Sequence, residues 1–141
     1  MAAPSNFLAS VLLVCLLAVS LTSGESDQDD CPDPKDIAPC KCDRSGLSCY
    51  ELKSEEELRR VFQASNRYKA YRSVWINGSP MKRLEKGVFN GHKIGDIFIE
   101  DGELEEIEDG AFEGTYEFVK KLSLFSNRLT KIPNGKRRQI L

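Results

Sequence analysis

The sequence predicts an α/β solenoid in which short parallel strands are stacked by a repeat. Three repeat units with the same internal spacing follow one another in the second half of the chain. They begin at Tyr71, Ile94 and Val119, so they are offset by 23 and then 25 residues. A period of this size is typical of proteins in which each unit buries its apolar edge against the next. Apolar residues alternate at the start of each unit, which indicates a strand with one buried face.

Each unit has the same order of apolar residues and glycines. The first has Tyr71, Val74, Ile76, Met81, Leu84, Gly87, Phe89 and Gly91, the second Ile94, Ile97, Ile99, Leu104, Ile107, Gly110, Phe112 and Gly114, and the third Val119, Leu122, Leu124, Leu129, Ile132 and Gly135. Arg137 stands where the first two units have a phenylalanine, so the third unit is incomplete. No cysteines follow to cap it, and we expect an uncapped C-terminal edge after Ile132, either for self-association or where sequence is missing.

The N-terminal residues have the pattern of a secretory signal peptide. Residues 1–24 contain no charged side chain, and 7–21 are almost wholly apolar. That stretch is shorter than the roughly 20 residues of a membrane-spanning helix. The pattern predicts cleavage near Gly24 or after Ser20, and therefore a secreted, extracellular protein. The alternative is an N-terminal membrane anchor; no later stretch predicts a membrane span.

The mature part, about 117 residues, is long enough for one small domain. We expect an acidic disordered stretch at 25–30, a cysteine-rich cap at 31–53, a helix plus repeats at 54–135 and a basic tail at 136–141. All 20 basic and 22 acidic residues lie after residue 24, and the net charge is −2. This balance offers no basic excess for nucleic-acid binding.

Four cysteines are clustered in the expected cap, at Cys31, Cys40, Cys42 and Cys49. An even, clustered set in a secreted chain predicts two disulfides, whereas a zinc site is disfavoured by the oxidising compartment and the lack of a nearby histidine. Cys40 and Cys42 are too close in sequence to pair well with each other. Two pairings remain: 31–42 with 40–49, or 31–40 with 42–49. Either would brace a cap over the open side of the first unit.

A helix is predicted between the cap and the repeats, from Ser54 to Ala64. Ser54-Glu-Glu-Glu57 has the form of a capping box, and its carboxylates suit the positive end of the helix dipole. Leu58, Val61 and Phe62 then recur at helical spacing, which predicts a helix face buried in the core.

The repeat skeleton resembles that of extracellular leucine-rich repeats, L-x-x-L-x-L-x-x-N-x-L-x-x-I-x-x-G-x-F, most closely over 119–133 with Asn127 at the Asn position. The C-x-C-x6-C pattern resembles the cap that precedes such repeats, which implies the pairs Cys31–Cys42 and Cys40–Cys49. Residues 31–42 are similar to a narrower group, the secreted arthropod leucine-rich-repeat proteins that resemble the non-catalytic subunit of oplophorus-luciferin 2-monooxygenase. This resemblance implies a shared scaffold and no light-producing activity.

The chain departs from that pattern at two turns. Ser79 and Gly102 replace the expected Asn, whose side chain bonds backbone groups of the turn. We therefore expect the first two turns to be looser than the third.

The residues between the buried strand positions point to the concave face of such a scaffold. Three of them are aromatic and three are charged: Trp75, Phe98, Phe125, Arg72, Asp96 and Glu100. Exposed aromatic residues ringed by charge are typical of a binding patch, so we predict that this face binds a protein or glycoconjugate. The alternative is that the N-terminal segment or neighbouring side chains cover them.

Asn77-Gly-Ser79 is the one glycosylation acceptor sequence, although the following Pro80 disfavours its use. A glycan on Asn77 would lie near Trp75 and crowd the predicted patch.

Catalysis has little support in the sequence. His92 is the sole histidine, the disulfides consume the mature thiols, and no paired metal-ligand or nucleophile motif occurs. The acidic run 103–109 has poor spacing for calcium. We therefore predict a chain that is not an enzyme and needs no metal or cofactor.

Other function classes remain open. The chain could be a non-catalytic accessory subunit that stabilises a separate secreted enzyme, or an exocrine component of saliva or venom. Gly135-Lys-Arg-Arg138 has the form of a peptide-precursor cleavage site, but the regular repeats before it favour a folded domain.

Overall fold

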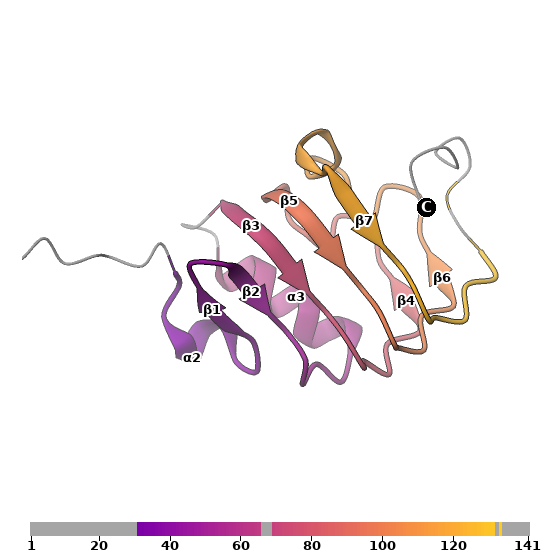
Figure 1. Ribbon diagram of the computed structural model, residues 1–141, viewed down its shortest axis with the longest axis horizontal. Coiled ribbons are helices and arrows are strands. Elements are labelled where there is room, and N and C mark those ends of the chain that lie inside the picture. Colours follow the sequence, from indigo (N-terminus) through magenta and orange to yellow (C-terminus); the bar gives the residue numbers. More distant parts are fainter. Residues whose placement is uncertain (1–30, 66–68, 132, 134–141) are drawn as a thin grey trace, which may run out of the picture.

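The computed structural model of the chain describes residues 31–65, 69–131 and 133 (Figure 1). The predicted signal peptide, the acidic stretch 25–30 and the basic tail 136–141 lie outside the described residues, as do Ile132, Gly135 and Arg137.

The fold is mixed α/β with a sheet that is mostly parallel. Its five strands are β1 (Lys41–Asp43), β2 (Gly46–Ser48), β3 (Ala70–Trp75), β5 (Lys93–Phe98) and β7 (Lys121–Ser123), in the spatial order β1-β2-β3-β5-β7. β1 and β2 are antiparallel, and the other neighbours are parallel. A second parallel sheet joins β4 (Arg83–Leu84) to β6 (Glu106–Ile107). Figure 1 shows the larger sheet as a row of strands, with β4 and β6 toward its β7 end.

The helices are short. They are α2 (Pro34–Ile37), α3 (Glu55–Ala64) and the 3-10 helix η2 (Tyr116–Phe118). Phe62 of α3 lies edge-on to Phe89 at 5.1 Å between ring centroids and to Tyr71 at 6.2 Å. The predicted apolar face of this helix is therefore in the core, and Leu58, Val61 and Phe62 are all buried.

The strand register follows the sequence repeat. Val74 pairs with Ile97, and Ile97 pairs with Leu122, so equivalent residues of the three units are neighbours in the sheet. Val74, Ile76, Ile97 and Ile99 are all buried beneath it. The parallel pairing and the inward residues predicted from the repeat are thus confirmed. Burying each such side chain contributes roughly 1.5–3 kcal/mol.

The cysteine-rich segment is joined to the first repeat strand. The disulfides are Cys31–Cys42 and Cys40–Cys49, with Cα–Cα distances of 5.7 and 4.3 Å, which confirms the pairing implied by the family resemblance. Gly46 of β2 has a φ of 140°, and a Cβ there would lie 1.9 Å from the carbonyl oxygen of Ser73. Only glycine allows β2 to approach β3 this closely.

The start of α3 differs in one detail from the predicted capping box. Ser54 is the N-cap, and its hydroxyl accepts a hydrogen bond from the Glu57 N–H at 3.2 Å, as expected. The Glu57 carboxylate, however, accepts from the Lys53 N–H at 2.8 Å rather than from Ser54. It therefore ties down the residue before the cap.

The second turn is bonded, although Gly102 lacks the expected Asn. Asn127 of the third unit donates through Nδ2 to the Ile99 carbonyl at 2.6 Å, and its Oδ1 accepts from the Leu104 N–H at 3.2 Å. A Cβ on Gly102 would lie 3.0 Å from this Oδ1. Gly102 thus leaves room for the next unit's amide, so the prediction of an unbonded second turn was wrong.

The first turn is bonded more locally. The Ser79 hydroxyl accepts from the Met81 N–H at 3.3 Å, and the Ser79 carbonyl accepts from the Glu103 N–H at 3.1 Å. Ser79 is buried, so the serine replaces part of what an asparagine would bond at this position.

Candidate binding face

The larger sheet has one face against the core and one outer face. Strand register places Ser48, Trp75, Phe98 and Ser123 in one row across β2, β3, β5 and β7. Their chain neighbours, such as Val74 and Ile97, point into the core, so this row lies on the outer face. The sequence prediction that Trp75 and Phe98 point away from the core fits this register.

Trp75 and Phe98 form a stack at the centre of the outer face. Their rings are nearly parallel, at an interplanar angle of 5°, with centroids 6.0 Å apart. The Lys121 ammonium lies 5.0 Å from the Phe98 centroid, on the side of β7. Phe98 is therefore placed between an indole and a cation. An aromatic pair typically contributes about 0.5–1.5 kcal/mol and an exposed cation–π contact about 0.5–1 kcal/mol, so the stack is held before any partner arrives.

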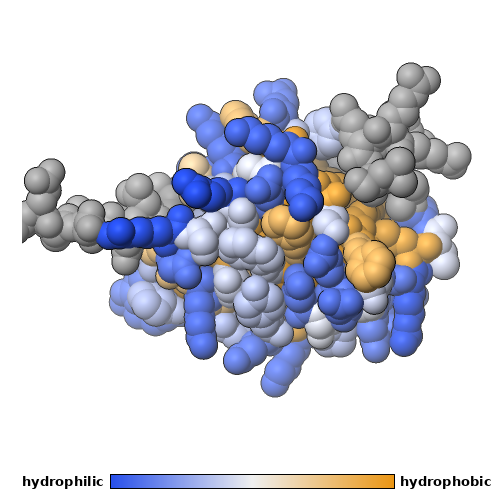
Figure 2. Space-filling view, in the orientation of Figure 1, coloured by the Kyte–Doolittle hydropathy of each residue, from blue (hydrophilic) through white to orange (hydrophobic). Residues whose placement is uncertain are grey.

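Phe125 is separate from this stack. The register gives Phe98 the neighbour Ser123, two residues before Phe125. The Phe125 carbonyl accepts from the Asp101 N–H at 3.1 Å, past the end of β7, and the side chain is 74% exposed. Figure 2 shows apolar surface at this end of the molecule. The predicted aromatic stripe is therefore a stacked pair plus one isolated, exposed ring.

The predicted charged residues surround the pair on β3 and β5. Arg72 is exposed, and Asp96 is half-buried in the row that links Ser73 with Lys121. Glu100 accepts a hydrogen bond from the Ser123 hydroxyl, which fixes that carboxylate next to the stack. The outer face thus presents both signs of charge around its aromatic centre.

Asn77, the predicted glycosylation residue, is only partly accessible. Its Oδ1 is buried and has no hydrogen-bond partner among the described residues. Ser79, the hydroxyl residue of the acceptor sequence, is buried and bonded to Met81. A glycosylating enzyme would thus need this segment before it is packed.

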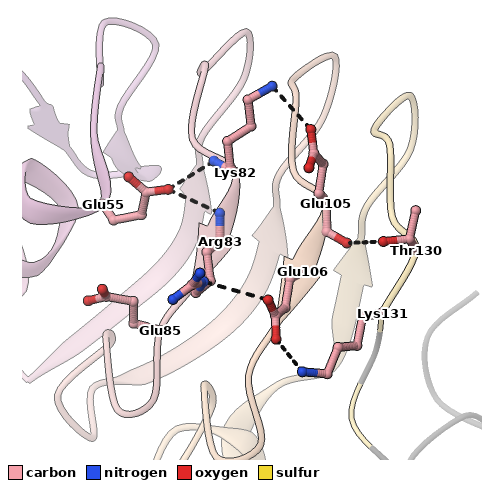
Figure 3. A pocket seen from close by; sticks show the side chains of 8 residues that line it. All are labelled: Glu55, Lys82, Arg83, Glu85, Glu105, Glu106, Thr130 and Lys131. Carbon is pink, nitrogen blue, oxygen red and sulfur yellow. Dashed lines mark hydrogen bonds and ion pairs between the residues drawn. The ribbon is translucent and has the colours of Figure 1, made fainter.

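A charged groove of about 330 Å³ lies away from the outer face, beside α3 and the smaller sheet (Figure 3). It is lined by Glu55, Lys82, Arg83, Glu85, Glu105, Glu106, Thr130 and Lys131. The Glu55 carboxylate accepts from the N–H groups of Lys82 and Arg83 at 2.9 and 3.0 Å. Burial alone would raise the pKa of Glu55, but these and other backbone hydrogen bonds lower it overall.

Ion pairs cross this groove from one repeat unit to the next. Lys82 Nζ lies 3.2 Å from Glu105, and Arg83 Nε lies 3.6 Å from Glu106, which also pairs with Lys131. The hydrogen bond from Lys131 lowers the pKa of Glu106. Because these charges neutralise one another, the groove is a cross-strand charge ladder rather than an acid–base site.

His92 is also unsuited to catalysis. Its ring is buried and stacked on Tyr71 at 5.8 Å, and its nitrogens lie 2.7 and 3.2 Å from the carbonyl oxygens of Phe89 and Ser65. Within residues 31–65, 69–131 and 133, no three His, Cys, Asp or Glu side chains are grouped so as to hold a metal ion. The same part of the chain contains no helix long and apolar enough to cross a membrane.

No protein-family model matches the chain, and no solved structure matches it. The chain is distantly similar to the Oplophorus-luciferin 2-monooxygenase non-catalytic subunit of Oplophorus gracilirostris. The two are 27% identical over 122 residues, which make up 82% of this chain and 34% of the relative. The chain thus spans about a third of the length of the curated relative that it matches. That relative is named as non-catalytic, which is consistent with a chain that has no enzyme activity of its own.

Proposed function

We propose that the chain is a secreted leucine-rich-repeat binding module, whose outer sheet face binds a protein or glycoconjugate. The observation that carries this proposal is the stack of Trp75, Phe98 and Lys121 on that face. Aromatic residues are enriched in the energetic centres of interfaces, and here they are already held in place.

A short leucine-rich-repeat solenoid accounts for the parallel strands at offsets of 23 and 25 residues and for the amide bonds of Asn127 between units. Secretion is supported by the two disulfides, which form in oxidising compartments. Glycosylation at Asn77 is part of the same proposal, and intact-mass analysis of the secreted protein tests it.

Ring geometry favours a protein over a sugar. Sugars bind aromatic residues by stacking on a free ring face, but both faces of Phe98 are covered, by Trp75 and Lys121. Trp75 is next to the small Ser48 in the row and has the more open ring face. A protein side chain can contact ring edges and the surrounding charges of Arg72, Asp96 and Glu100 together.

The test is capture of a partner from the native fluid with the full mature chain as bait. Phe98→Ala should abolish capture because it removes the central ring of the stack. Phe118→Ala is a matched control, since Phe118 also lies under a lysine, with Lys93 Nζ 5.3 Å from its centroid, but in η2. Equal capture by both variants would refute binding through this face.

One observation favours a second function, an accessory subunit that stabilises a separate enzyme. The relative described above is itself named a non-catalytic subunit. Stoichiometric, salt-resistant co-purification with a catalytic chain, and loss of that enzyme's activity when this chain is removed, would support this alternative. Turnover by the purified chain alone would exclude both functions.

A further inference from the structure

An apolar groove of about 480 Å³ lies next to η2, at the end of the second repeat unit. It is lined by Asp109, Gly110, Ala111, Phe112, Glu113, Gly114, Tyr116, Glu117, Leu122 and Pro133. Its apolar part comes from Ala111, Phe112 and Leu122. Its rim carries three exposed carboxylates, those of Asp109, Glu113 and Glu117. The groove therefore suits an occupant that is both apolar and basic.

The equivalent place on the first unit is already covered. Phe112 of the second unit stacks on Phe89 of the first at 5.4 Å, with an interplanar angle of 13°. The Gly87 N–H donates to the Gly110 carbonyl at 3.0 Å, and a Cβ on Gly114 would lie 3.1 Å from Gly91 Cα. Residues 110–114 thus lie directly on residues 87–91. The groove is the same surface on the second unit.

The sequence indicates what covers it. Leu122 pairs with Ile97 at an offset of 25 residues. The same offset places residues 135–139 over 110–114, and Arg137 over Phe112. Residues 134–141 lie outside the described part of the chain, but Pro133, which precedes them, lines the groove. Lys136, Arg137 and Arg138 supply three positive charges opposite the three rim carboxylates.

We propose that this groove is a docking site for residues 134–141 of the same chain. The Arg137 guanidinium covers the Phe112 ring, as Phe112 covers Phe89, and a cation–π contact replaces the aromatic stack. The basic side chains pair with the rim carboxylates. Glu113 is shared with Lys86, whose Nζ lies 3.7 Å away, so Glu117 is the less engaged rim partner. This site is distinct from the outer face of the sheet and does not depend on the function proposed for that face.

The test uses NMR and hydrogen exchange on the full mature chain. Arg137→Ala should shift the Phe112 ring and Leu122 methyl resonances and speed amide exchange across residues 111–117 about fivefold, the ratio that one exposed cation–π contact represents. Arg137→Phe, which restores the residue of the other two units, should retain the slow exchange. Lys120→Ala, an exposed base on the outer face, should leave the Phe112 resonances unchanged.

A second variant tests the charges without touching the core. Glu113→Gln/Glu117→Gln changes two exposed carboxylates and should speed tryptic cleavage at Lys136, Arg137 and Arg138 about threefold, because weaker docking leaves the segment open to the protease more often. Identical resonances in the native and Arg137→Ala chains, or unchanged cleavage in the double variant, would overturn the proposal. Resonances that change with protein concentration would also overturn it, because the occupant would then be a second molecule.

Discussion

Replacing Asn127 by alanine should lower the free energy of unfolding by about 2–3 kcal/mol. The amide makes two short bonds from Nδ2, to Ile99 at 2.6 Å and Leu124 at 3.0 Å, a longer one to Phe125 at 3.3 Å, and accepts at Oδ1 from Leu104 at 3.2 Å. Each bond contributes about 0.5–1.5 kcal/mol net, and leaving half-buried backbone groups unpaired adds to the cost. The sum is reduced because the bonds share one nitrogen.

The assay is equilibrium urea unfolding of the unglycosylated mature chain, followed by Trp75 fluorescence. The midpoint should fall while the slope m stays constant, since a change in m would report a different denatured or native state. Asn77→Ala is the matched control, because the Oδ1 of Asn77 is buried and makes no hydrogen bond within the described residues. Its removal should change stability by less than about 0.5 kcal/mol. If Asn127→Ala is no more destabilising than Asn77→Ala, the amide does not hold the second turn.

Three further outcomes are expected. Gly46→Ala should separate β2 from β3 and cost at least about 2 kcal/mol, since its Cβ would lie 1.9 Å from the Ser73 carbonyl; thermal unfolding measures this. The pKa of Glu106 is lowered by Lys131, so its contribution to stability is present above the unfolded carboxyl pKa and is lost as pH falls through the folded value. Glu106→Gln should therefore be less stable than the native chain at pH 7 and equal to it in strong acid, and a constant gap in urea titrations would contradict this. Phe125→Ser should leave the melting temperature almost unchanged because the ring is 74% exposed, and a large loss of stability would show that it packs.

Much of the fold follows from the repeat spacing. Val74, Ile97 and Leu122 are neighbours because a parallel sheet aligns equivalent positions of successive units. The cysteine spacing left two pairings open, and only the family resemblance distinguished them. Local signals also identified α3, but they could not show that Glu57 would bond Lys53.

The binding face was harder to predict in detail. Trp75 and Phe98 are 23 residues apart, so their contact is a consequence of register. The next offset of 25 leads from Phe98 to Ser123, and the same count excludes Phe125 from the row. The bond from Asn127 to the preceding unit was missed because a turn signature describes contacts within one unit. The burial of His92 was missed because a turn position alone gives no measure of exposure.

The sheet is secured unequally at its two ends. β1 and β2 are fastened by two covalent crosslinks, whereas β7 has a strand neighbour on one side among the described strands. In stacked units each interface depends on the one beside it, so fraying has a direction. The molecule should lose order from β7 toward β3, while β2 persists as a template on which the strands re-form. A ligand that spans β3 to β7 would then act as a clasp, because it would close the end from which unfolding begins.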